Sequence, residues 1–173
     1  LRAGVPMRNL NEWQYGLASL KFRWNVSGTY QQALPRYVSV DPDGTEHEPL
    51  AELFADPFDG LNRVFLKGYQ WPFDVNKARG SSLIDILVQE EIFGRGRRVY
   101  LDFTRNPSCV ERAGFDGLSE EARTYLTRSG ALSGTPIERL RRMNPGAIDL
   151  YAAHGIDLTR EMLEIGVCAQ HCN

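Results

Sequence analysis

Cysteine and long apolar runs are scarce in this sequence. Its three cysteines, at irregular spacing in 173 residues, do not make the even set that a disulfide framework needs. We therefore expect a reducing compartment and assign the chain to the cytoplasm. No apolar run approaches the roughly 20 residues that span a bilayer. Residues 1–10 hold two arginines but no apolar block typical of a signal peptide. No membrane span is expected.

An excess of basic charge is also missing. The chain has 20 Lys and Arg against 22 Asp and Glu, a formal net charge of −2. A surface that follows a phosphate backbone needs a basic excess. The charge balance therefore excludes nucleic acid as an expected partner.

The motifs that hold a nucleotide or activate a nucleophile do not occur. Gly94-Arg95-Gly96-Arg97 lacks the third glycine of a Gly-x-Gly-x-x-Gly loop, and it follows a predicted helix rather than a strand. Neither a Walker loop nor a Gly-x-Ser-x-Gly elbow is present. We do not expect this chain to hold a dinucleotide pyrophosphate by itself.

What the sequence does contain is a mixture of strand and helix patterns. Short aromatic and β-branched runs between Gly, Ser and Pro predict strands. These lie at residues 13–15, 21–24, 37–40, 99–103 and 163–167. Residues 41–44, Asp-Pro-Asp-Gly, predict a turn, since Pro presets φ and Gly accepts positive φ.

Apolar residues spaced i, i+3 and i+4 predict several helices. They are expected at 50–54, from Pro57, from a Ser81 or Ser82 cap to Gly94, from Ser119, from Thr135, and from Asn144 to about His154. Strands, helices and strands again, without regular βαβ alternation, indicate an α+β fold. We expect a single domain of small mixed β-structure with several packed helices. The 42 % apolar content is sufficient for a packed core.

Two thiols and one imidazole fall within residues 168–172. A tetrahedral metal site needs a fourth ligand, which usually comes from a second close-spaced pair of ligands. Cys109 and His154 could supply one, but each stands alone in the sequence. We therefore expect no metal, although a small metalloprotein using Cys168, His171 and Cys172 stays open as an alternative. His171 is either a structural histidine or a donor to an anionic substrate, because imidazole can be charged near neutral pH.

Several segments resemble one family. Residues 74–85 (DVNKARGSSLID), a helix through Glu91-Ile92 and then 98–102 (RVYLD) look like the capping domain of the fumarate reductase and succinate dehydrogenase flavoproteins. Residues 3–6 and 11–15 resemble the segment where that family's chain leaves its FAD-binding domain. Residues 169–173 are similar to the segment where it returns.

The resemblance implies that residues 1–173 are the cap, or substrate domain, of a longer flavoprotein. Its terminal segments, about 1–20 and 163–173, would lead to the FAD-binding domain of the same parent chain. FAD would be bound mainly by that domain, and the isolated chain would be inactive. The cap would enclose a water-poor cavity over the flavin and supply groups that bind a small anionic substrate.

Two departures from the family point away from fumarate. The family's substrate-binding histidine follows Gln-Phe, whereas here Gly16 follows Tyr15. The family's proton-delivering arginine falls in register with Ser81, and Arg79 lies two positions earlier. The resemblance therefore implies a relative with a different substrate. We predict Arg79 as the catalytic cation.

We also predict His171, Arg23 and Arg36 as substrate-binding residues. Because a cap buries one face against its partner domain, we expect an exposed apolar patch with Trp13, Trp24 and Trp71. The alternative is a stand-alone α+β binding or interaction module without catalysis.

Overall fold

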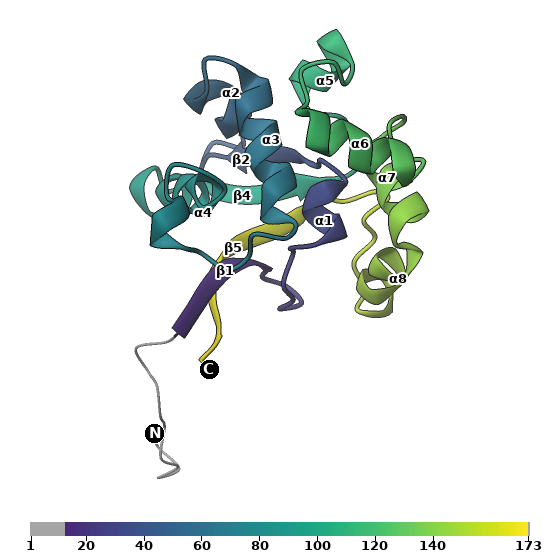
Figure 1. The fold of residues 1–173 in the computed structure, drawn as a ribbon. Coiled ribbons are helices and arrows are strands. Elements are labelled where there is room, and N and C mark those ends of the chain that lie inside the picture. Colours follow the sequence, from purple (N-terminus) through teal and green to yellow (C-terminus); the bar gives the residue numbers. More distant parts are fainter. Residues whose placement is uncertain (1–12, 173) are drawn as a thin grey trace.

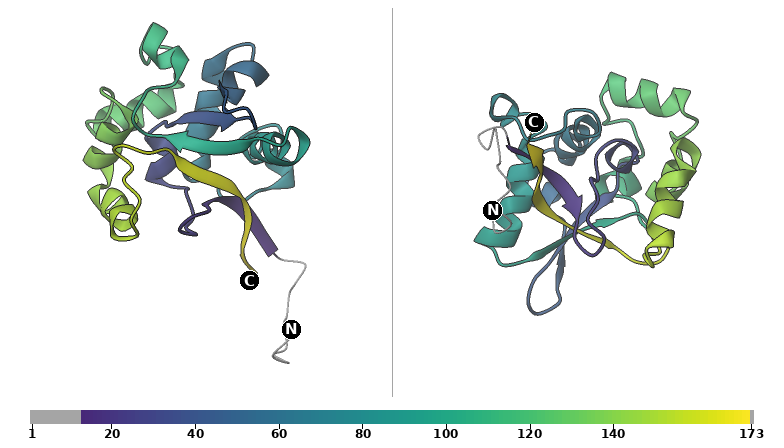
Figure 2. Two further views of the ribbon diagram at one scale, coloured as in Figure 1. Left: turned by 180° about the vertical axis from the view of Figure 1, so that it is seen from behind. Right: turned by 90° about the horizontal axis from the view of Figure 1, so that it is seen from below.

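The computed structural model describes residues 13–172, with side chains for residues 14–169. Over residues 13–172 the chain forms eight α-helices and one five-stranded antiparallel sheet. The α+β fold expected from the sequence is confirmed. The helices lie in front of the sheet in Figure 1, and the view from behind in Figure 2 leaves the strands uncovered.

The sheet has the strand order β1-β5-β4-β2-β3. Its strands are β1 (Trp13–Ser19), β2 (Arg36–Val40), β3 (Glu46–His47), β4 (Arg98–Asp102) and β5 (Leu163–Cys172). Alternation along β4 and β5 buries Val99, Leu101 and Ile165 against the helices. On the uncovered face Arg98 and Glu164 form an ion pair of 2.6 Å. This alternation is typical of a sheet with one solvated face.

The predicted strand at residues 21–24 is wrong. The chain turns back on itself here, because the Ser19 amide donates to Trp24 O at 2.9 Å and Ser19 Oγ also bonds to Phe22 O. The Phe22 ring stacks on His154 with centroids 3.6 Å apart and meets the edge of Tyr151. The aromatic residues of this segment therefore pack against α8 rather than line a strand.

Most of the predicted helices are present. The helices are α1 (Thr29–Gln32), α2 (Pro49–Leu53), α3 (Pro57–Lys67), α4 (Leu83–Gln89), α5 (Ser108–Ala113), α6 (Glu120–Arg128), α7 (Pro136–Met143) and α8 (Pro145–Ala153). A 3-10 turn, η2 (Val75–Lys77), precedes α4, and a π-helical turn, η3 (Glu90–Gly94), continues it. The sequence did not predict α1 or α5, which are short.

The predicted cap of α4 is correct in position, since Ser82 is the N-cap residue, but the expected side-chain bond is missing. Neither Ser81 nor Ser82 closes the first turn of α4 by a side-chain bond. Instead Ser82 Oγ accepts the Asp74 amide at 2.9 Å, and Ser81 Oγ donates to Gln70 Oε1 at 2.7 Å. Both hydroxyls therefore hold the loop of residues 70–82 against the start of α4.

The described residues form two adjoining hydrophobic clusters. The larger lies between the sheet and the helices α1, α3, α4, α7 and α8, and the smaller lies among α3, α5 and α6. Arg139, fully buried in α7, donates to the carbonyl oxygens of Ala33 and Leu34 at 2.8 and 3.2 Å. Burial lowers the pKa of its guanidinium to about 10. These hydrogen bonds replace the water that the buried charge has lost.

Strands β1 and β5 form an antiparallel ribbon at one edge of the sheet. Their register runs from Ser19 opposite Ile165 to Trp13 opposite Cys172, with an irregularity between Gln14 and Tyr15. In Figure 1 this ribbon leaves the body of the molecule at its lower end. We call it the β1–β5 ribbon.

Candidate functional site

Three chain segments meet at the β1–β5 ribbon. Within the ribbon Gln14 pairs with His171 and Tyr15 with Ala169. The loop after β1 returns to the ribbon, because Arg23 Nη2 donates to Ala169 O. The loop of residues 70–82 is attached on the other side, since the Phe73 amide donates to Tyr15 O at 2.7 Å. The ribbon therefore gathers the segments that contain Arg23, Arg79 and His171.

Arg23 is held loosely at this position. Its side chain is exposed, and the hydrogen bond to Ala169 O uses only one of its guanidinium nitrogens. Ala169 lies two residues before His171 in β5. Its other N–H groups have no partner among the residues whose side chains are described, and a guanidinium binds a carboxylate or phosphate in a forked geometry.

Arg79 lies in the loop between η2 and α4. Its side chain is exposed and forms no hydrogen bond or ion pair within the described residues. Hydrogen bonds of the flanking Asp74, Ser81 and Ser82 fix the loop around it. The guanidinium is therefore exposed and without a partner among the described residues.

His171 belongs to β5, where its backbone faces Gln14. Its side chain lies outside the described residues, so the predicted contact with substrate stays a prediction. The same holds for the imidazole and thiol of the predicted alternative metal site at His171 and Cys172. Among the residues whose side chains are described, no group of three His, Cys, Asp or Glu could hold a metal ion.

Arg36 lies apart from the other predicted residues. It starts β2, and its guanidinium pairs with Glu48 at 2.6 Å, with Glu46 at 3.2 Å and with Asp102 at 3.7 Å. Burial alone would raise the pKa of Asp102, but hydrogen bonds from Thr104 and Arg105 outweigh it and lower that pKa. Three carboxylates thus surround Arg36, and its charge is already balanced. We do not include Arg36 in the site.

Next to the ribbon, Trp71 covers Gly16. A Cβ atom at position 16 would overlap the indole of Trp71, so only glycine fits under this ring. The resemblance places the family's substrate-binding histidine at this position. Trp71 is partly buried by this contact, whereas Trp24 is 47 % exposed. The side chain of Trp13 lies outside the described residues.

An apolar hollow of about 290 Å³ opens between the ribbon and α4. It is lined by Tyr15, Phe73, Asp85, Ile86, Gln89 and Val167. We call it the Asp85 hollow. In its wall Asp85 pairs with Lys67 of α3, with Nζ and Oδ2 2.7 Å apart and both side chains at most 2 % exposed. Burial raises the pKa of the Asp85 carboxyl, and the nearby Lys67 offsets only part of this effect.

This buried pair was not predicted from the sequence. Its signal was a charge on an otherwise apolar helix face, since Asp85 lies among Ile84, Leu87 and Val88. Lys67 likewise continues the apolar face of α3 three residues after Val64. Such a charge is rarely buried unless it is paired.

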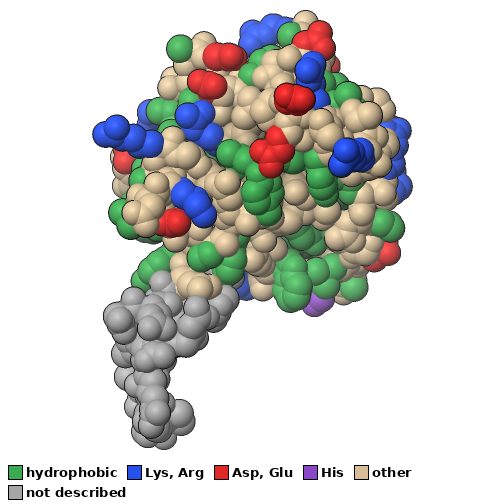
Figure 3. Space-filling view, viewed as in Figure 1, with side chains coloured by type: hydrophobic (Ala, Val, Ile, Leu, Met, Phe, Trp, Pro, Cys, Tyr) green, Lys and Arg blue, Asp and Glu red, His purple; other side chains and the backbone are tan. Residues whose placement is uncertain are grey.

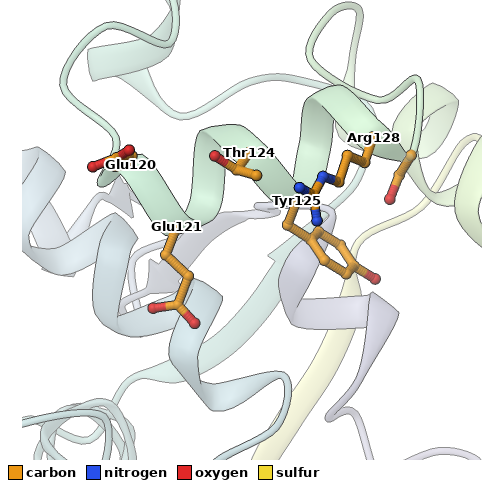
Figure 4. A pocket seen from close by; sticks show the side chains of 6 residues that line it. Glu120, Glu121, Thr124, Tyr125 and Arg128 are labelled. Carbon is orange, nitrogen blue, oxygen red and sulfur yellow. The ribbon is translucent and has the colours of Figure 1, made fainter.

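A larger hollow, about 640 Å³, lies along α6 (Figure 4). Its lining comes from α6 and the residue that follows it: Glu120, Glu121, Thr124, Tyr125, Arg128 and Ser129. Of these, Glu121 accepts a hydrogen bond from Tyr69, and Tyr125 donates one to Gln32 at 2.9 Å. We interpret this hollow as an open polar surface, because one helix forms nearly all of it.

No protein-family model, curated protein or solved structure matches the chain. Function must therefore be argued from its own residues and their geometry. In the part of the chain that the structure describes, every helix is too short or too polar to cross a membrane.

Proposed function

We propose that this chain is the substrate-capping part of an FAD-dependent oxidoreductase resembling the fumarate reductase and succinate dehydrogenase flavoproteins. Its substrate would be a small anion other than fumarate, and its compartment the cytoplasm. The observation on which the proposal rests is the gathering of the Arg23, Arg79 and His171 segments at the β1–β5 ribbon. The resemblance assigns the two strands of this ribbon to the chain's departure from and return to the FAD-binding domain.

The surface around the ribbon fits a lid over a planar ring system. Tyr15, Leu20 and Trp24 are 48 %, 46 % and 47 % exposed. Figure 3 shows hydrophobic side chains along the lower edge of the body, near the base of the ribbon. Exposed apolar groups next to arginines suit a cover that excludes water from one side of a flavin and binds an anion at its rim.

The residues of this chain would have distinct roles in the proposed reaction. FAD, bound by the partner domain, would exchange a hydride with the substrate. Arg23 would bind an anionic group of the substrate, and the predicted His171 contact would orient it. Arg79, which has no competing partner among the described residues, would deliver the proton. Trp71 over Gly16 closes the position from which the family's histidine would bind a dicarboxylate, which supports a different substrate.

The coding sequence of the parent protein gives the first test. We expect Gly-Gly directly after Asn173 and Gly-x-Gly-x-x-Gly upstream of Leu1. The 173-residue chain purified by itself should be colourless, since it lacks a pyrophosphate-binding loop. A flavin spectrum from this chain, or a parent gene without a dinucleotide-binding motif, would contradict the proposal.

Variants of the parent flavoprotein give the second test. Arg79→Gln should lower kcat about 100-fold, the usual effect of losing a positioned proton donor, with FAD content unchanged. Arg160→Gln, at a guanidinium that is 85 % exposed and pairs only with Asp157 among the described residues, is the matched control. The measurement is anaerobic reoxidation of the reduced flavin by substrate. Equal rates for the two variants would remove Arg79 from the mechanism.

The alternative of a stand-alone binding module is favoured by one observation, the Asp85 hollow. A parent gene that encodes little beyond these residues would support this alternative and would exclude the cap.

A further inference from the structure

We propose that Gln70 and Ser81 are positioning residues that hold the backbone of Arg79 in place. The inference rests on the proposed function, in which Arg79 delivers the proton, and it names the residues through which the fold would act on that group. Three observations support it: a hydrogen bond between the side chains of Gln70 and Ser81, a tight turn that contains Arg79, and the attachment of Gln70 to the buried Lys67–Asp85 pair.

The side chains of Gln70 and Ser81 close the loop that contains Arg79. Ser81 Oγ donates to Gln70 Oε1 at 2.7 Å, across 11 positions of the chain. Gln70 follows the end of α3, and Ser81 precedes the start of α4. Because Ser81 is fully buried, loss of the Gln70 acceptor would leave its hydroxyl without a partner among the described residues. The hydrogen bond therefore ties the two ends of the loop together.

Arg79 lies in a tight turn next to Ser81. The amides of Gly80 and Ser82 both donate to Lys77 O, at 2.8 and 3.1 Å. The Arg79 side chain adds no hydrogen bond or ion pair with the described residues. The position of its backbone is therefore set by the turn, and Ser81 connects the turn to the rest of the chain.

The other end of the hydrogen bond is attached to the interior. Gln70 O lies 3.5 Å from Lys67 Nζ, and Lys67 forms the buried pair with Asp85 at 2.7 Å. Asp85 belongs to α4, the helix that Ser81 precedes. The buried pair therefore holds Gln70 beside the start of this helix, where its side chain meets Ser81.

A fixed backbone matters to a proton donor, because the reach of the side chain must match the position of the substrate. A misplacement of about 1 Å can cost up to about 100-fold in rate. Loss of the Gln70 acceptor would free the turn, so Arg79 would meet the substrate in the correct geometry less often. Substrate binding through Arg23 would not change. The expected signature is a lower kcat with an unchanged KM.

The first experiment measures the loop in the 173-residue chain. Gln70→Met removes the acceptor at nearly constant side-chain volume, and hydrogen exchange of the Gly80 and Ser82 amides is followed by NMR. We expect both amides to exchange about tenfold faster than in the unsubstituted chain, because the turn opens more often. Gln70→Glu keeps an acceptor oxygen and should restore the original exchange rate. Unchanged exchange in Gln70→Met would overturn the proposal.

A second variant and a control separate the hydrogen bond from general stability. Ser81→Ala removes the donor and should raise exchange by the same factor, with no further increase in the double variant Gln70→Met/Ser81→Ala. Tyr125→Phe is the matched control, because it removes a hydrogen bond of 2.9 Å from α6 to Gln32. An equal effect of Tyr125→Phe on the two loop amides would reject the assignment.

The second experiment measures the reaction of the parent flavoprotein. Gln70→Met should lower kcat about tenfold with KM and FAD content unchanged, and Gln70→Glu should restore kcat. A normal rate in Gln70→Met, where Arg79→Gln is slow, would remove the positioning role and leave the proposed function standing. A normal rate in Arg79→Gln would contradict the proposed function itself, and with it the role of Gln70 in the reaction.

Discussion

At the scale of single residues, Lys67 and Asp85 form a buried ion pair in the described interior. Both are almost fully buried, and each is compensated mainly by the other across 2.7 Å. Removing one partner leaves an uncompensated charge, whereas removing both leaves only a packing change.

We therefore expect Lys67→Met to lower the free energy of unfolding by about 3 kcal/mol. The double variant Lys67→Met/Asp85→Leu should recover most of this loss. Urea unfolding followed by circular dichroism measures both. A single variant as stable as the parent chain would mean that the two charges are not coupled as their distance indicates.

The same residue pair marks the limit of what the sequence could predict about the site. Arg79 and His171 were predicted by position in the resemblance, and Arg23 and Arg36 as further cations. The loops that contain Arg23 and Arg79 are bonded to the β1–β5 ribbon, through Arg23 and Phe73, whereas Arg36 pairs with carboxylates elsewhere. Lys67 and Asp85 were not predicted, because α3 and α4 bring them together from 18 positions apart, across a loop that contains the 3-10 turn η2. A local sequence pattern does not reveal a contact between two residues so far apart in the chain.

At the scale of elements, α7 shows how local chemistry begins a helix. Thr135 and Glu138 form a capping box, in which the Thr135 amide donates to Glu138 Oε2 at 2.8 Å. This backbone hydrogen bond, followed by one from the Thr135 hydroxyl, lowers the pKa of the Glu138 carboxyl.

The sign of the pH effect follows from that shift. A carboxyl whose pKa is lower in the folded chain adds stability above its unfolded pKa, about 4.3, and loses it as the pH falls through the folded value. We expect Glu138→Gln to be less stable than the parent chain at pH 7, with the difference shrinking below about pH 4. Urea unfolding at several pH values is the measurement. Glu120→Gln, at an exposed carboxylate without a hydrogen bond to the described residues, should show a smaller change.

Elements were predicted well where local residues decide them. The Ser119 and Thr135 helix starts and the turn at 41–44 are correct, since their hydrogen bonds lie within a few residues. The strand predicted at 21–24 failed because Phe22 packs on Tyr151 and His154, more than a hundred positions away. Aromatic residues are frequent in strands and also pack against other rings, so their presence alone does not distinguish the two.

At the scale of the whole molecule, the ribbon places positions 13 and 172 opposite each other. A domain whose connecting strands lie together tolerates being opened elsewhere, provided that the new ends are exposed. The β2–β3 turn is such a place, since residues 42–46 are exposed.

We expect a circular permutant that joins residues 172 and 13 through a short Gly-Ser linker, and opens between Asp43 and Gly44, to fold. Its Tm should lie within a few degrees of that of the parent chain. A second permutant opened inside α7, next to the buried Arg139, should fail to fold. Thermal unfolding by circular dichroism compares them, and failure of the first permutant would contradict the pairing of β1 with β5.

The ribbon also has a mechanical meaning. Two hydrogen-bonded strands resist stretching and shear in their own plane but bend easily out of it. The register irregularity between Gln14 and Tyr15 interrupts the ladder near the outer end of the ribbon, so we expect the ribbon to bend most easily there.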